Sequence, residues 1–259
     1  EVLATSSEQG LIRSLVQMDQ PDHTAYRELV QPWFKPTNIK ALGDRLEELT
    51  KDILDQMMGD GTSQECDFVQ DVSIYAPLRL ITELLGVPQR DEWRILKLTN
   101  ELFAGDDPEM QRIADDPLSI FDTIKDIYQY FSDLTDKFRE HPDESLASYI
   151  ANGKIDGEYM PYKELISYYT IVATAGHDTT RNSITGGVLA LNQFPDQYDK
   201  LRENVKLIPN MVAEIIRWQT PLTHMRRTAL EDVELQGKTI KKGDKVLMWY
   251  VSGNRDTAV

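Results

Sequence analysis

The stretch that decides the fold is YYTIVATAGHDTT, residues 168–180. It lies in the middle of a segment, from about Met160 to Gln193, whose apolar residues recur with helical period and in which no proline follows Pro161. At ~1.5 Å per residue a helix of this length is roughly 50 Å long and crosses a whole domain. Because residues 168–175 are apolar on nearly every side, we expect this part of the helix to be buried all round.

Helical periodicity continues on both sides of this segment. Apolar residues at spacings of three and four, with proline or glycine at the breaks, predict helices over residues 23–30, 37–57, 74–85, 88–103, 118–140 and 209–218, and a short one that begins at Pro195. Weak alternation predicts a short strand at Cys66–Val69. Residues 104–116, with paired aspartates, predict a mobile surface loop, and residues 141–159 predict a loop with a short helix.

After Pro221 the period of the apolar residues changes to two. This pattern predicts strands at Val233–Leu235, at Ile240 and over Lys245–Val251, joined by turns at Gly237 and Gly243. We therefore expect a mainly α fold, with a helical region over residues 1–220 and a small β region over residues 221–259.

The composition indicates a globular protein and argues against several kinds of function. The 259 residues hold 28 Lys and Arg against 43 Asp and Glu, and a net charge of −15 disfavours a nucleic-acid binder, which needs a basic surface. A single cysteine excludes an internal disulfide and a Cys-rich zinc site, and it fits the reducing cytoplasm. No apolar run approaches the ~18 residues of a membrane span.

The residues Ala175 to Thr180 are unusual in a buried helix. A glycine, an acid and two hydroxyls are poor helix formers, so their presence costs stability. Small residues let a flat group approach the backbone, and Thr179 can hydrogen-bond the carbonyl four residues back, which would open a polar notch beside Asp178. A tolerated glycine with solvated neighbours is the alternative explanation for this stretch.

Two charged pairs also have the spacing of one helix face. Glu214 and Arg217 are three residues apart, and an ordinary surface pair would explain them. His23 and Arg27 are four apart and could hold an anionic group together, although a solvated basic face explains them equally well. Neither pair identifies a function by itself.

Taken in chain order, these features resemble a bacterial cytochrome P450, a haem-thiolate monooxygenase, over nearly the whole chain. The motifs that carry the resemblance are Met18–Pro21 with His23 and Arg27, Ala175–Thr179, Glu214–Arg217, Arg227–Ala229, Glu231–Leu235, Gly237, Ile240, Gly243–Asp244 and Asn254–Asp256. The resemblance implies that family's helical fold with its long central helix, haem b as cofactor and O2 as co-substrate.

The resemblance also implies a role for individual residues. Ala175 and Gly176 would lie over the distal face of the haem, where small side chains leave room for dioxygen. Asp178 and Thr179 would be catalytic, because they would hydrogen-bond bound oxygen and relay protons. The haem propionates would be held by His23, Arg27 and Arg227. A buried structural pair would be formed by Glu214 and Arg217. The substrate pocket would be lined by Ile171, Val172, Leu222 and Thr223. We assign His177 no catalytic role.

The family's iron ligand is a Cys thiolate in a glycine-rich loop beyond the Asn-Arg-Asp turn. Cys66 lies far too early and lacks those glycines, so we predict no metal ligand within the sequence and expect the axial Cys beyond Val259. We therefore expect these residues to be an incomplete, inactive fragment from the middle of a longer enzyme.

The motifs are also similar to those of bacterial terpene-alcohol and alkane hydroxylases. This likeness implies a small apolar substrate, terpenoid or alkane-like, and electrons from a ferredoxin-type partner. Two other functions stay open at this point: a metal-dependent phosphohydrolase using His177 and Asp178, and a non-catalytic helical binding protein. The phosphohydrolase would need more than the four histidines present.

Overall fold

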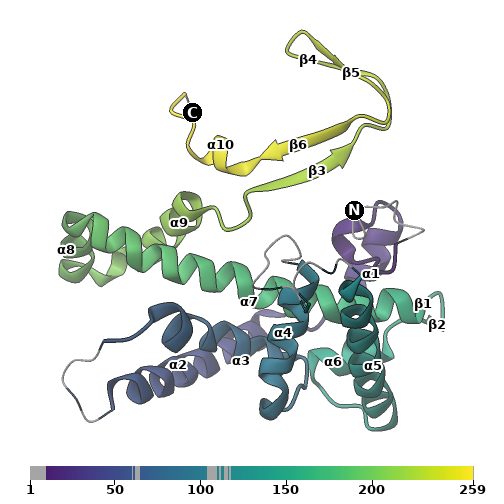
Figure 1. The fold of residues 1–259 in the computed structure, drawn as a ribbon, viewed down its shortest axis with the longest axis horizontal. Helices are drawn as coiled ribbons and strands as arrows, with labels where there is room; N and C mark the ends of the chain where they lie inside the picture. Colours follow the sequence, from purple (N-terminus) through teal and green to yellow (C-terminus); the bar gives the residue numbers. More distant parts are fainter. Residues whose placement is uncertain are drawn as a thin grey trace. The chain divides into compact units, whose positions relative to one another are not determined.

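A computed structural model describes residues 10–59, 61, 65–103, 110, 112–113, 116 and 118–258. The fold is mainly helical, as predicted, with three small antiparallel strand pairs (Figure 1). The α-helices are α1 (Asp22–Val30), α2 (Pro36–Met58), α3 (Tyr75–Leu84), α4 (Glu92–Phe103), α5 (Ser119–Glu140), α6 (Leu146–Asn152), α7 (Tyr162–Gln193), α8 (Pro195–Glu203), α9 (Ile208–Gln219) and α10 (Tyr250–Asn254).

Shorter elements connect these helices. The 3-10 turns are η1 (Leu15–Gln17), η3 (Gln89–Asp91) and η4 (Val205–Leu207), and η2 (Phe68–Ser73) is a π-helical turn. The strands are β1 (Lys154–Ile155), β2 (Glu158–Tyr159), β3 (His224–Thr228), β4 (Val233–Leu235), β5 (Lys238–Ile240) and β6 (Lys245–Trp249), paired as β1–β2, β3–β6 and β4–β5. The predicted loop at 104–116 lies mostly outside the described residues.

The chain divides into two compact units, and the division falls inside α7. Unit 1 is Glu1–Asp178 and unit 2 is Thr179–Val259. The change from helices to strands falls between Gln219 and His224, close to the position predicted from the change of period.

Unit 1 contains a large hydrophobic core formed by α1, by α3 to α6 and by the first half of α7. Phe131 of α5 stacks on Tyr169 of α7 with ring centroids 5.1 Å apart and planes 5° apart. The Tyr169 hydroxyl donates to the carbonyl of Ala147 in α6 at 2.9 Å, so its one polar atom is satisfied inside the core. These contacts fix α7 between α5 and α6 and so support the stretch that decides the fold.

Unit 2 consists of the last part of α7, α8, α9 and the strands β3 to β6 with α10. Strands β3 and β6 pair in antiparallel register, with Arg227 opposite Val246, and β4 and β5 form a separate hairpin. Helix α9 approaches α7 closely at Gly187, where an added Cβ would lie 2.6 Å from the Cδ1 of Ile215. The glycine at this position therefore allows the two helices of unit 2 to meet.

Several local predictions are wrong. Residues predicted as a strand at 66–69 begin η2 instead, because the Asp67 carboxylate accepts hydrogen bonds from the backbone N–H groups of Val69 and Gln70 at 2.9 and 3.1 Å. The strand predicted over 245–251 ends at Trp249, because the backbone N–H of Tyr250 donates to the carbonyl of Thr223 and α10 begins. The sequence also did not indicate β3 or the β1–β2 hairpin.

Candidate functional site

Helix α7 runs without a break through the stretch Ala175–Thr179, so the polar notch suggested by the sequence is not an opened turn. Ala175 is exposed, which corrects the prediction that residues 168–175 are buried all round; Tyr168 and Tyr169 are buried as expected. The exposed Ala175 places only a small side chain on this face of α7, which leaves room for a ligand to approach the helix.

Gly176 faces a different neighbour from the one that the family resemblance implies. An added Cβ would lie 2.5 Å from both Cδ1 and Cγ1 of Ile81 in α3 and 3.1 Å from its Cβ. Ile81 is itself buried in the core of unit 1. The absence of a side chain at Gly176 is therefore explained by the close packing of α7 against α3, and a haem contact at Gly176 stays a prediction.

The catalytic candidates flank the division between the units. Asp178 and Thr179 are both half-buried, Asp178 in unit 1 and Thr179 in unit 2. The hydroxyl of Ser183 donates to the carbonyl of Thr179 at 2.8 Å, one turn further along α7. The predicted pocket residues Ile171 and Val172, one to two turns earlier, are half-buried, and Val172 packs against the core of unit 1.

The predicted propionate clamps of unit 1 lie one turn apart in α1. His23 is half-buried and Arg27 is exposed, so both side chains can offer N–H donors to an anion. Helix α1 is connected to α7 nearby, because the hydroxyl of Tyr168 donates to the carbonyl of Tyr26 at 3.4 Å. Burial raises the pKa of Tyr168 to about 12, and the positive charge of Arg27 partly opposes this shift.

Arg13, which sequence reasoning did not find, fixes the start of α1. Its guanidinium bridges Asp22 in the first turn of α1 at 2.5 Å and Glu164 in the first turn of α7 at 3.2 Å. The hydrogen bond to Asp22 raises the pKa of Arg13, so the cation persists at all ordinary pH values. The partners of Arg13 are 9 and 151 residues away, and no local pattern in the sequence could have indicated the second one.

Glu214 and Arg217 form a two-pronged ion pair in α9. Arg217 donates through Nε and Nη2 to the two carboxylate oxygens of Glu214 at 2.7 and 2.6 Å. We predicted that this pair is buried, but in the structure the Arg217 side chain is 42% exposed and the Glu214 side chain is 59% exposed. The hydrogen bonds from Arg217 lower the pKa of Glu214, so the carboxylate stays ionised at neutral pH.

Arg217 also connects α9 to the Asn-Arg-Asp turn at the end of α10. Its Nη1 donates to the carbonyl of Asn254, and the side-chain amide of Asn254 donates to the hydroxyl of Thr220 at 3.0 Å. Arg255 donates to the carbonyl of Trp218 at 2.9 Å and lies over its ring, 4.6 Å from the centroid. Two motifs that are 37 residues apart in the sequence are thus held together within unit 2.

The other predicted site residues of unit 2 are exposed. Arg227 lies in β3, and its Nη1 donates to the carbonyl of Arg226 at 3.0 Å. Leu222 is 48% exposed, and the exposed Thr223 contacts the ring of His224 through its hydroxyl at 3.1 Å. Leu222 and Thr223 lie in the short segment between α9 and β3.

Cys66 does not lie beside any predicted haem residue. It is exposed, its Sγ lies 3.7 Å from the Sδ of Met57, and the two line a hollow of about 290 Å³ with Tyr75 and Asp71. Within the described part of the chain no group of three or more His, Cys, Asp or Glu side chains is arranged to hold a metal ion. Nor is any described helix both long and apolar enough to cross a membrane.

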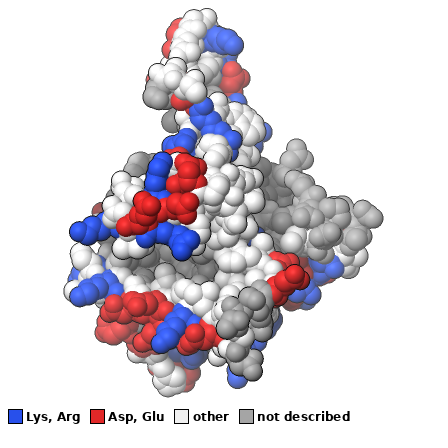
Figure 2. All heavy atoms as spheres, turned by 90° about the vertical axis from the view of Figure 1, so that its left-hand side faces the viewer, with Lys and Arg blue, Asp and Glu red and all other residues white. Residues whose placement is uncertain are grey.

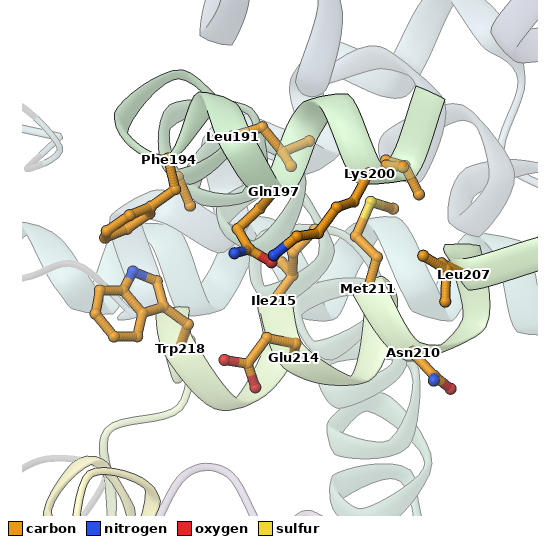
Figure 3. A pocket seen from close by; sticks show the side chains of 13 residues that line it. Leu191, Phe194, Gln197, Lys200, Leu207, Asn210, Met211, Glu214, Ile215 and Trp218 are labelled. Atoms are coloured by element: carbon orange, nitrogen blue, oxygen red, sulfur yellow. The ribbon is translucent and has the colours of Figure 1, made fainter. Parts of the chain in front are cut away.

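A largely apolar hollow of about 510 Å³ lies in unit 2 between the end of α7, α8 and α9 (Figure 3). Phe194 and Trp218 close one side of it, edge to face with ring centroids 5.7 Å apart. Figure 3 shows the Lys200 side chain extending toward Gln197, with the Glu214 carboxylate on the α9 side. None of the predicted haem or catalytic residues lines this hollow, although Glu214 of the predicted structural pair does.

Charged side chains are mixed on the surface. On the face shown in Figure 2, the described acidic and basic side chains form small mixed groups separated by uncharged surface. Among its described residues this face has no continuous basic stripe of the kind that binds nucleic acid.

Comparison with known proteins decides the family. A family model for cytochrome P450 matches residues 1–259. The chain belongs to the cytochrome P450 family. The helical fold with a long central helix that the resemblance implied is thereby confirmed.

Relatives of known activity include several P450 hydroxylases. The chain is 38% identical to cytochrome P450-terp of a Pseudomonas species over 257 residues, which is 96% of this chain and 59% of that protein. It is 32% identical to linalool 8-monooxygenase of Pseudomonas putida and 39% identical to steroid C26-monooxygenase of Mycolicibacterium smegmatis, covering 62% and 55% of them. The chain therefore spans about three fifths of the length of the P450 relatives it matches.

Solved P450 structures have the same fold. A cytochrome P450 of Novosphingobium aromaticivorans matches with a TM-score of 0.85 at 37% identity, over 100% of this chain and 61% of its own. A Mycobacterium marinum P450 in complex with pseudoionone matches with a TM-score of 0.88 at 31% identity, over 96% and 60%. The alternative of a metal-dependent phosphohydrolase has no support from these comparisons.

Membership of the P450 family implies haem iron as the cofactor and dioxygen as the co-substrate. The described residues fit part of this group: His23 and Arg27 offer N–H donors for carboxylates, and Ala175 places a small exposed side chain on α7. The described residues do not supply the thiolate that would bind the iron, because the one cysteine, Cys66, lies in the hollow beside Met57.

Proposed function

We propose that the protein is a haem-thiolate monooxygenase that inserts one oxygen atom of O2 into a C–H bond of a small apolar substrate and reduces the other to water. The observation that carries the proposal is the family match over residues 1–259, together with the exposed small residue Ala175 in the middle of α7. When bound, the haem supplies the activation of dioxygen. The residues of this chain bind, orient and supply protons.

We assign the haem propionates to His23, Arg27 and Arg227. A guanidinium is planar and presents paired N–H donors that match a carboxylate, and both arginines are exposed on their own units. The side chains of His23 and Arg27 are one turn apart in α1, which lets them contact one anionic group together. Arg13 supports them indirectly by fixing the start of α1.

Asp178 and Thr179 are the proposed proton-transfer residues. A hydroxyl both donates and accepts a hydrogen bond, and a neighbouring carboxylate can exchange protons with solvent, so the pair can pass a proton to the reacting group. Both side chains are half-buried, which keeps them accessible to a few water molecules. Glu214 and Arg217 have a structural role in this proposal, because they connect α9 to Asn254.

The proposed substrate is terpenoid or lipid-like. This choice is supported by the names of the relatives, which include P450-terp, linalool 8-monooxygenase and a methyl-branched lipid omega-hydroxylase. The apolar residues Ile171, Val172 and Leu222 with Thr223 would contact the substrate. We propose a ferredoxin-type protein as the electron donor and the cytoplasm as the compartment, which agrees with a single unpaired cysteine.

The reduced, CO-bound absorption spectrum of the protein expressed from its complete coding sequence tests the cofactor. A thiolate-type Soret band is expected, and a spectrum without it would refute the proposal. Stoichiometric haem with a non-thiolate spectrum would instead favour a haem-binding protein without oxygenase chemistry.

Replacement of Thr179 tests the proton-transfer step. Thr179→Ala should lower the product formed per O2 consumed by about tenfold, since one positioned acid–base group typically contributes at least that much. The matched control is Thr180→Ala, because Thr180 is the next residue of α7 and is exposed. Equal coupling in the two variants would remove Thr179 from the proposed role.

A further inference from the structure

His177 is a buried imidazole in α7 to which the proposed function gives no task. Only 1% of its surface is exposed, and its Nε2 lies 3.1 Å from the Oγ1 of Thr99 in α4, which is 3% exposed. The two residues are 78 positions apart in the sequence, and both lie in unit 1. Their contact therefore joins two helices directly beside Asp178.

The geometry assigns the direction of this hydrogen bond. The Thr99 hydroxyl lies 3.0 Å from the carbonyl oxygens of both Ile95 and Leu96 in its own helix, and its single proton goes to one of them. The Thr99 oxygen then accepts from His177, which places a proton on Nε2 of the imidazole. A buried bond of this kind has one defined orientation, so it restricts the rotation of the helices that it joins.

The same bond determines which face of α7 is left open. Successive residues of a helix are ~100° apart, so Ala175 lies two positions, or ~200°, from His177. Helical spacing puts Thr179 four residues after Ala175 and on the same face. With His177 directed at α4 and Gly176 packed on Ile81 of α3, Ala175 points to the opposite side, where it is exposed.

Helix α4 is itself held in place by other contacts, so a hydrogen bond to α4 restricts the rotation of α7. Two residues after Thr99, the buried Glu101 accepts a hydrogen bond from the hydroxyl of Thr123 in α5 at 2.7 Å. It also accepts from the Nε of Arg112 at 2.9 Å. A rotation of α7 that kept the His177 bond would have to carry α4 with it and break these contacts.

We infer that His177 is a positioning residue: its hydrogen bond to Thr99 fixes the rotation of α7 against α4, so that Ala175 and Thr179 face the cofactor and substrate. This inference rests on the proposed function for the identity of that open face. It gives a task to the one imidazole of the stretch Ala175–Thr180, and it adds Thr99 to the residues on which the site depends.

Four variants test the inference in the protein expressed from its complete coding sequence. Thr99→Val removes the hydroxyl and keeps the shape, His177→Leu removes the donor, and the double variant removes both. Thr99→Ser keeps the hydroxyl and serves as the conservative rescue. The matched control is Thr82→Val, because Thr82 is equally buried and its hydroxyl lies 2.8 and 3.1 Å from the carbonyls of Leu78 and Arg79 in its own helix.

The first measurement is the product formed per O2 consumed. Thr99→Val and His177→Leu should each lower this ratio by about two- to tenfold, as expected for one lost hydrogen bond, while the double variant is no worse than the more severe single one. Thr99→Ser and Thr82→Val should keep the ratio of the unmodified protein. An equal loss in Thr99→Ser would show that packing rather than the hydrogen bond matters, and would overturn the inference.

The second measurement is hydrogen exchange of the backbone amides of residues 176–180 in the same purified protein, a readout that does not depend on the proposed reaction. These amides should exchange about two- to tenfold faster in Thr99→Val and His177→Leu than in Thr82→Val. Unchanged exchange refutes the positioning role. Faster exchange in a protein that gives no thiolate-type spectrum would confirm the contact between α4 and α7 and refute the proposed function instead.

Discussion

Unit 1 buries its apolar side chains, whereas unit 2 leaves comparable ones exposed. Among the described residues, every buried apolar side chain lies at or before Ala173. In unit 2 the helices and strands still show apolar faces, but several large side chains on them are exposed, with Ile216 at 52%, Trp249 at 55% and Leu235 at 58%. The difference shows that a periodic apolar face in the sequence predicts a helix or strand without predicting what covers it.

The two units are consequently stabilised by different interactions. Unit 1 has stacked rings, such as Phe131 on Tyr169, and polar contacts that close inside its core. Unit 2 has an exposed hydrogen bond from Arg217 to Glu214, a partly buried one from Arg217 to Asn254, and edge-to-face ring contacts such as Phe194 on Trp218. Buried apolar area contributes far more per residue than exposed ion pairs, so we expect the units to respond differently to mutation.

The largest difference between the two units should be in the loss of stability caused by removing an aromatic ring. Phe131→Ala should lower the free energy of unfolding by about 3–5 kcal/mol, because a 2% exposed ring leaves a cavity in the core of unit 1. Phe194→Ala in unit 2 is the control, since that ring is 43% exposed and should cost less than half as much. Urea denaturation measures both, and equal losses would contradict the contrast between the units.

A smaller difference in stability is expected between alanine substitutions at two glycines of α7. Gly176→Ala should lower the free energy of unfolding by about 1–3 kcal/mol, because its Cβ would overlap the buried side chain of Ile81, including the Cβ of that residue. Gly187→Ala is the matched variant, and there the overlap is chiefly with the terminal Cδ1 of Ile215, which can rotate away. Thermal unfolding of the two variants should rank Gly176→Ala as the less stable, and the reverse order would contradict this account.

Hydrogen exchange should distinguish the units without any mutation. Amides in the middle of α5, whose apolar face is buried, should exchange at least about tenfold more slowly than those of α9, none of whose side chains is buried. Mass spectrometry of peptides from the two helices provides the comparison. Similar protection in α9 would mean that its apolar face is covered.

The smallest effect should come from the exposed ion pair of α9. Because Arg217 lowers the pKa of Glu214 from its ordinary value of 4.5, the pair adds stability above that value and loses it as the pH falls through the lowered pKa. Glu214→Gln should therefore be slightly less stable than the unmodified protein at pH 7, and this difference should shrink as the pH falls below 4.5. Unfolding measured from pH 7 downward provides the test, and a difference that does not shrink as the pH falls would point to a role beyond the ion pair.

The helices were predictable because their signals are local. The repeat from Leu42 to Met57, the glycine after it and the prolines at 195 and 209 gave helices close to α2, α8 and α9 as the structure has them. The strand pairs were less predictable, because Arg226 and Arg227 have no alternating pattern and become β3 only by pairing with Leu247 and Val246 of β6. The pairing of distant strands depends on tertiary contacts.

The candidate site, like the fold, was predictable only where its residues belong to local motifs. Ordered motifs identified the family and named Asp178, Thr179, Glu214 and Arg217, and the match over the chain confirms the family. They did not find Arg13 or Thr99, because an arginine or a threonine is ordinary in any helix-rich chain. Only the positions of Glu164 and His177, 151 and 78 residues away, give those two residues a task.

Local patterns in the sequence were therefore enough to predict that this chain is helical, that one long helix dominates it, and that its motifs resemble those of a cytochrome P450. Only the tertiary structure decided that Gly176 accommodates Ile81, that His177 is directed at Thr99, that Ala175 is open and that the Glu214–Arg217 pair is exposed. The physical reason is that helical periodicity and caps are encoded within a few residues, whereas the rotation of a helix depends on contacts with residues far away in the chain.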